Sequence, residues 1–153
     1  MGAEASFDEF VRSHQRRLWQ ALVPVAGPEG AEDALAETLG RVWRDWDRIA
    51  EMDNTVGYVY TAARRTAVRS LTAPPALPTP DAHVVPDFEP GLLPALEQLS
   101  EMQRQVVYLV DGFGWGLTDT ARVLEISVST VRNHRGRALE RLRELMKVRE
   151  RDG

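Results

Sequence analysis

The sequence has 153 residues, of which 43% are hydrophobic, with a formal net charge of −4 and no cysteine. This length suits one ordinary domain or two small ones, and the apolar content suffices for a core in either case. The lack of cysteine excludes disulfides, thiolate metal sites and cysteine nucleophiles. No apolar run approaches the roughly 20 residues of a membrane-spanning helix, and the first ten residues are too acidic for a signal peptide, so we expect a soluble cytoplasmic protein without membrane insertion.

Residues 1–71 predict a first domain of three helices. Ser6 and Glu9 form a capping box, which predicts the start of an amphipathic helix. We expect this helix to end near Pro24, because proline disrupts the interior of a helix.

A second helix is predicted over residues 31–46, where apolar residues recur at three- and four-residue spacing. Trp43 and Trp46 share that spacing, which favours packing of both indoles in the core over stacking on nucleic-acid bases. Residues 53–55 offer capping side chains for a third helix that runs to about Leu71.

Residues 72–94 predict a linker. The segment from Pro74 to Pro94 holds seven of the nine prolines, and the linker contains three acidic residues and no lysine or arginine. A proline-rich chain is extended and rises roughly 3.1 Å per residue, so the linker could span up to about 70 Å. We expect two domains on such a tether to share little interface of their own.

Residues 95–153 predict a second helical domain. Residues 92–99 indicate a short helix at its start. Ser100 and Gln103 form another capping box and open a further helix. Three glycines, at positions 112, 114 and 116, are expected to end that helix.

Residues 117–143 predict a helix-turn-helix, the unit that many proteins use to read DNA. Ser127 can cap the second helix by accepting a hydrogen bond from a backbone N–H two or three residues later. The small and apolar positions that the unit needs are occupied by Ala121, Leu124, Ile126 and Val131.

The outer face of the second helix carries side chains suited to base edges and phosphates, namely Ser129, Thr130, Arg132, Asn133, Gly136 and Arg137. Residues 132–151 hold eight basic residues against three glutamates, whereas the whole chain is acidic. Because phosphate neutralisation supplies most non-specific affinity, we expect weak DNA binding by the chain alone and a partner that contributes the rest. The alternative is a plain helical hairpin with a solvated basic face.

Arg135 is the anomaly of this helix. At about 100° per residue it falls within the apolar arc that includes Val131, Ala138 and Leu142. An unpaired buried guanidinium is costly, so Arg135 must extend to solvent, pair with an acid or displace the helix.

The order of these pieces resembles a bacterial group IV, or extracytoplasmic-function, sigma factor. Residues 31–49, AEDALAETLGRVWRDWDRI, are similar to the polymerase-binding segment of the family. Residues 54–71, NTVGYVYTAARRTAVRSL, are similar to its minus-10 segment, and residues 96–110 with the helix-turn-helix are similar to its minus-35 domain. The resemblance covers nearly the whole chain. It departs from the family pattern at Arg65, Ala36 and Glu125, where asparagine, glutamine and a turn glycine are usual.

The resemblance implies an all-α protein that binds core RNA polymerase, directs it to a promoter class and helps to open the duplex, without being an enzyme itself. The residues implied to face the polymerase are Glu32, Asp33, Glu37 and Arg41. Those implied to lie near the minus-10 strand are Asn54, Tyr58, Arg64, Arg65 and Arg69. The family resemblance also implies an anti-sigma protein that covers the same acidic helix, in competition with the polymerase.

Other classes of function stay open. One is a helix-turn-helix regulator that acts without being a sigma subunit, and another is a sigma mimic that titrates an anti-sigma partner. No catalytic constellation and no cofactor-binding motif is present in the sequence. His14, His83 and His134 lie far apart without ligand spacing, so we expect no metal site.

Overall fold

The computed structural model describes residues 2–71 and 91–152, and every regular element in these two ranges is a helix. The expected all-α class is therefore confirmed. Most of the predicted linker, residues 72–90, lies outside the described residues. No helix within the two described ranges is long and apolar enough to cross a membrane.

The first helix, α1 (Ala3–Arg44), is a bent hairpin with two arms. The bend lies at Gly27, whose φ of 76° and ψ of 170° interrupt the helical backbone. Glycine adopts positive φ without the steric cost that a Cβ imposes, and Pro28 follows at the first position of the second arm, where proline is favoured. The predicted end near Pro24 is thus close to the observed bend. The predicted capping box is wrong, because the helix starts before it and Ser6 instead accepts a hydrogen bond from the Trp46 indole at 3.3 Å.

Two further helices complete the first bundle. A single turn, α2 (Trp46–Ile49), leads into α3 (Thr55–Ser70), which packs along α1. Asn54 caps α3 by accepting a hydrogen bond from the Gly57 N–H at 3.1 Å, as the sequence predicts. Trp46 is only 5% exposed and lies in the core, whereas Trp43 is 44% exposed. The core prediction is therefore wrong for Trp43, which instead contacts Phe7 at the surface with ring centroids 5.0 Å apart.

The second half begins with two short helices, α4 (Leu93–Glu97) and α5 (Glu101–Val107). The capping box of Ser100 and Gln103 is confirmed, with both of its hydrogen bonds present at 3.2 Å. After α5 the chain continues as a π-helical turn, η1 (Tyr108–Gly112), closed by a hydrogen bond from the Phe113 N–H to the Tyr108 carbonyl. The helical run therefore ends at Gly112, the first of the three glycines, as the sequence predicts.

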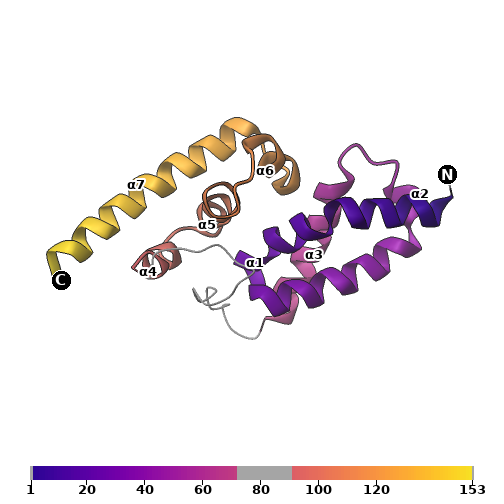
Figure 1. The fold of residues 1–153 in the computed structure, drawn as a ribbon, viewed down its shortest axis with the longest axis horizontal. Coiled ribbons are helices and arrows are strands. Elements are labelled where there is room, and N and C mark those ends of the chain that lie inside the picture. Colours follow the sequence, from indigo (N-terminus) through magenta and orange to yellow (C-terminus); the bar gives the residue numbers. More distant parts are fainter. Residues whose placement is uncertain (1, 72–90, 153) are drawn as a thin grey trace.

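The last two helices are α6 (Leu117–Leu124) and the long α7 (Val128–Asp152). In Figure 1 the helices α5 and α6 lie between the α1–α3 bundle and α7, and the two chain ends lie at opposite ends of the molecule. α7 packs on α5 and α6 near its start and on α4 near its end.

The two halves share one hydrophobic core, which corrects the expectation of little interface. Leu109 and Val123, both at most 3% exposed, lie in the same cluster as Leu22 and Val59 of the first bundle. α6 packs on α3, while α5 and η1 pack on α1. The stabilising free energy is roughly proportional to the apolar surface area removed from water, so this shared core holds the two halves together.

Candidate nucleic-acid interface

The predicted helix-turn-helix is formed by α6, a tight turn and the start of α7. Ala121 and Val131 are buried against Val106 of α5, as the small and apolar pattern requires. The Ile126 N–H donates to the Ala121 carbonyl at 3.0 Å and closes the turn. Ser127 caps α7 by accepting from the Thr130 N–H at 3.1 Å.

Glu125 takes the left-handed conformation in this turn, with φ 56° and ψ 42°. A residue with a Cβ costs about 1–2 kcal/mol there, and the family that the sequence resembles usually has glycine. The Glu125 carboxylate accepts a hydrogen bond from the Thr61 hydroxyl of α3 at 3.2 Å. A residue that is unfavourable for the turn therefore contributes a contact to the first bundle.

The predicted reading face of α7 is open to solvent. Its exposed members are Ser129, Arg132, Asn133, Gly136 and Arg137, while Thr130 is half-buried and hydrogen-bonds the Ser127 hydroxyl at 2.7 Å. The opposite face of α7 is buried through Val131, Ala138 and Leu142. The geometry presents cationic and amide side chains together on one side of a helix with nothing covering them in the described residues.

Arg135 pairs with an acid, one of the three outcomes that its position allows. Its guanidinium makes a two-pronged contact with Asp111 of η1, with Nε 3.0 Å from Oδ2 and Nη2 2.7 Å from Oδ1. The two side chains are 40% and 29% exposed, so the pair lies at the rim of the domain core rather than inside it.

The predicted minus-10 residues on and before α3 do not form one free surface. Asn54 donates to the Arg122 carbonyl of α6 at 2.8 Å, and Arg64 pairs with Glu101 of α5. Both are therefore occupied by the second half. Arg65 and Arg69 are exposed on the outer side of α3, where the Arg69 Nε donates to the Arg65 carbonyl.

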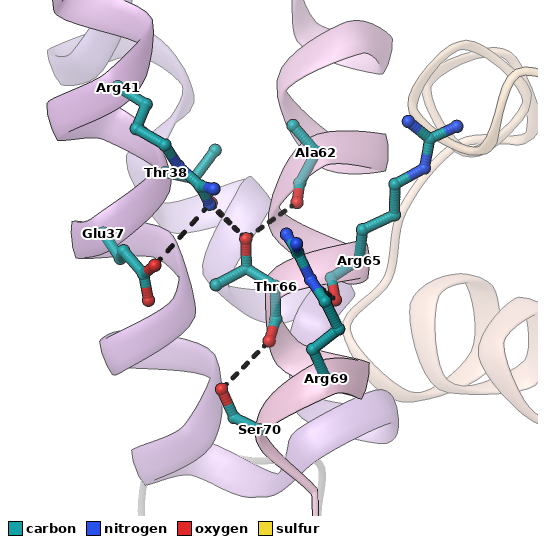
Figure 2. A network of polar contacts seen from close by, with 8 residues as sticks. All are labelled: Glu37, Thr38, Arg41, Ala62, Arg65, Thr66, Arg69 and Ser70. Carbon is teal, nitrogen blue, oxygen red and sulfur yellow. Dashed lines mark hydrogen bonds and ion pairs between the residues drawn. The ribbon is translucent and has the colours of Figure 1, made fainter.

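Figure 2 shows the polar network that joins α3 to the second arm of α1. The Arg41 guanidinium donates to the Thr66 hydroxyl and lies 3.9 Å from the Glu37 carboxylate. The Thr66 hydroxyl in turn donates to the Ala62 carbonyl at 3.1 Å. Arg41 is thus tied to the fold of the first bundle, and Tyr58 lines a hollow of about 230 Å³ beside it.

The other predicted polymerase-facing residues, Glu32, Asp33 and Glu37, are exposed along the second arm of α1. Trp43 lies exposed on the same arm. The sequence pattern missed this indole as a surface residue because its spacing matches the apolar stripe. In the structure it contacts Phe7 and is still 44% exposed.

Several side chains that the sequence did not single out join the two halves. The Gln105 amide donates to the Tyr60 hydroxyl at 2.8 Å in a buried position, and burial raises the pKa of Tyr60 above its ordinary range. The Trp115 indole donates to the Gln20 side chain at 2.9 Å. No local pattern could identify these partners, because each pair is far apart in the sequence.

An open hollow of about 370 Å³ lies where the first arm of α1, the segment before α3 and α6 meet. Its lining includes His14, Asp53 and Arg122, and Arg122 donates to the Asp53 carbonyl at 2.9 Å. Burial and the nearby cations Arg17 and Arg122 lower the pKa of His14. Within the described ranges no group of three or more histidine and carboxylate side chains is arranged to hold a metal ion.

Known proteins share both the sequence and this arrangement. The family model for sigma-70, region 4, matches residues 92–142. The chain is 32% identical to an RNA polymerase sigma-E factor of Streptomyces antibioticus, over 99% of this chain and 90% of the relative. It is also 28% identical to the ECF RNA polymerase sigma factor SigM of Mycobacterium tuberculosis, over 95% of this chain and 79% of the relative. This chain belongs to the extracytoplasmic-function sigma factors.

Two solved structures share the fold of this sigma factor. The sigma factor RpoE of Bartonella quintana, crystallised with the anti-sigma factor NepR, has a TM-score of 0.62 and 22% identity, covering 93% of this chain and 97% of that chain. CnrH, solved with the cytosolic domain of CnrY, has a TM-score of 0.62 and 19% identity, covering 93% and 88%. As a sigma factor, the protein is a transcription initiation factor.

Proposed function

We propose that this sigma factor works in the cytoplasm, binds core RNA polymerase through the second arm of α1, reads the minus-35 element with α7 and engages the minus-10 element through α3. The observation that carries the proposal is the open reading face of α7, which joins Arg132, Asn133 and Arg137 on a helix braced from behind. Arginine and asparagine make two-pronged contacts with guanine and adenine edges, each worth roughly 1–3 kcal/mol of discrimination.

Polymerase binding is assigned to the exposed carboxylates Glu32, Asp33 and Glu37. Trp43 adds a large apolar surface to the same arm. Interfaces combine tryptophan anchors with surrounding charges that guide the encounter, so this surface supports a docking role for the arm.

The minus-10 assignment requires the two halves to separate. Asn54 and Arg64 are engaged by α6 and α5, and the Thr61 hydroxyl lies 3.2 Å from Glu125 in the turn of the helix-turn-helix. Elements centred about 25 base pairs apart lie about 85 Å apart along DNA, at 3.4 Å per base pair. Touching domains cannot occupy both elements at once. We therefore assign the described arrangement to a closed form that opens on the promoter.

An anti-sigma partner fits the same scheme. RpoE of Bartonella quintana was crystallised with the anti-sigma factor NepR, and the closed form of this chain offers a compact target for such a partner. We propose that an anti-sigma protein covers the acidic arm of α1 and competes there with core polymerase.

Reconstituted transcription tests the proposal. Core polymerase with the wild-type chain should initiate at a defined subset of fragments from a genomic library, whereas core alone should not. The variant Arg132→Ala/Asn133→Ala/Arg137→Ala should lose this selectivity but still bind core, because its changes lie outside α1. Tight, sequence-specific DNA binding without core would favour the regulator alternative. Capture of an anti-sigma protein without any initiation would favour the mimic.

A further inference from the structure

The ion pair between Asp111 and Arg135 lies at a structural junction. Three successive residues of η1 pack in three different clusters: Tyr108 with α4 and α7, Leu109 with the first bundle, and Val110 with the helix-turn-helix core. Asp111 follows directly and extends toward α7. Such π-turns are rare and often occur at functional sites.

Arg135 lies between the two apolar anchors of α7. Val131 anchors the start of the helix against α5 and α6, and Ala138 with Leu142 anchors the next turns against α4 and α5. At the intervening position on the same flank there is no apolar side chain, only the guanidinium held by Asp111. The ion pair therefore occupies the place of a packing contact.

The geometry of the pair restricts the orientation of the Arg135 guanidinium relative to the Asp111 carboxylate as well as the distance between them. The Arg135 Nε lies 3.0 Å from Oδ2 and 3.3 Å from Oδ1 of Asp111, and Nη2 lies 2.7 Å from Oδ1, so two nitrogens of a planar guanidinium contact both oxygens of a planar carboxylate. Two-pronged pairs of this kind add geometric specificity, which a single ammonium contact cannot supply. The cation is also one residue before Gly136 and three after Arg132, so a change in its position moves the reading face directly.

We propose that Asp111 and Arg135 are positioning residues that fix the orientation of α7 and thereby the sequence preference of its reading face. The inference rests on the proposed minus-35 role of that face. Arg135 is assigned no DNA contact in this scheme, because its Nε and Nη2 groups donate to Asp111. Base-reading side chains need placement to within about 0.5 Å, so loosening the pair blurs the preference more than it weakens binding.

The test uses the full chain in complex with core RNA polymerase and a pool of duplexes randomised over the upstream element. The bound fraction is sequenced for the wild type, Asp111→Asn, Arg135→Lys and the double variant. Each single change should reduce the enrichment of preferred sequences about three- to tenfold, which corresponds to about 0.7–1.4 kcal/mol and lies within the range of coupling energies between contacting residues. The double variant should lose no more of this enrichment than either single variant. Asp111→Glu should retain more of the sequence preference than Asp111→Asn.

Two controls separate positioning from stability and from direct contact. Glu144→Gln removes another carboxylate that pairs with an arginine of α7, at 3.4 Å from Arg141, and should leave the preference unchanged. In Arg135→Gln the dependence of binding on salt should match that of the wild type. If the slope of log affinity against log salt concentration fell in magnitude by about one, Arg135 would contact a phosphate and the inference would be overturned.

Three further outcomes also decide the matter. An unchanged preference with a lower melting temperature in Asp111→Asn and Arg135→Lys would show a merely structural pair and overturn the inference. If the wild-type complex initiates transcription but enriches no upstream motif, the minus-35 assignment fails and the positioning role fails with it. A wild-type complex that does not initiate at all would instead refute the proposed function as a whole.

Discussion

The Gln105 side-chain amide donates a hydrogen bond of 2.8 Å to the Tyr60 hydroxyl across the boundary between the two halves. Gln105 is 2% exposed and Tyr60 is 3% exposed. A buried polar group without a partner costs about 1–3 kcal/mol. Each of the two side chains avoids this cost in the shared core because the other satisfies its hydrogen bond. The pair is therefore satisfied only while the halves stay together or water replaces the missing partner.

Tyr60→Phe should lower the free energy of unfolding by about 1–3 kcal/mol, because the Gln105 amide stays buried without its acceptor. Gln105→Leu together with Tyr60→Phe should recover most of that loss, since both polar groups are then gone. Urea unfolding of the full chain measures both effects. Tyr58→Phe is the matched control, and strictly additive effects of the two changes would contradict the coupling.

Glu101→Gln should favour the open form by removing the partner of Arg64. Both side chains are partly exposed, so the pair is worth at most about 1 kcal/mol and the open population should rise up to about fivefold. Solution scattering reports the larger radius of gyration, and binding of a single-stranded minus-10 oligonucleotide reports access to α3. Glu140→Gln on exposed α7 is the control. Unchanged oligonucleotide affinity in Glu101→Gln would argue against a closed form that hides the minus-10 surface.

Asp33→Lys with Glu37→Lys should weaken the complex with core polymerase while the fold is preserved. Both carboxylates are exposed, and exposed substitutions usually change stability by no more than about 0.5 kcal/mol. Titration of labelled protein with core enzyme measures the affinity, and circular dichroism measures helicity. The double reversal at Glu140 and Glu144 on α7 is the control for net charge. Undiminished core binding would refute the assignment of the α1 arm.

The same two charge reversals should also weaken the binding of an anti-sigma protein that competes for this arm. Isolation of a stable complex that contains the inhibitor, this chain and core polymerase together would contradict such competition.

His14 should make the fold less stable at acidic pH. Its pKa is lowered in the folded protein by burial and by Arg17 and Arg122, so the unfolded chain takes up a proton near the ordinary value of 6.5 before the folded chain does. The contribution of neutral His14 is complete above pH 6.5 and is lost as the pH falls through the lower folded value. The free energy of unfolding should differ less between pH 7.5 and pH 5.5 in His14→Gln than in the wild type. Equal differences in the two proteins would exclude this role, and His134→Gln serves as the control.

Local sequence patterns determined the helices and their ends where the signal lies within a few residues. The capping box of Ser100 and Gln103, the Asn54 cap and the turn after Ala121 all depend on hydrogen bonds between near neighbours. The capping box at Ser6 failed because the helix begins earlier and the hydroxyl serves a tryptophan 40 residues away.

The tertiary structure alone decided which of these helices touch and which side chains they occupy. Periodicity places Trp43 and Trp46 on the same stripe, but only the tertiary packing buries Trp46 of α2 against Phe10 and leaves Trp43 of α1 exposed. Periodicity also marks Arg135 as anomalous without identifying Asp111 as its partner. The contact between the two halves through Tyr60 and Gln105 has no local signature in the sequence. Helix formation depends on neighbours along the chain. Contacts between distant residues depend instead on how apolar faces match in space.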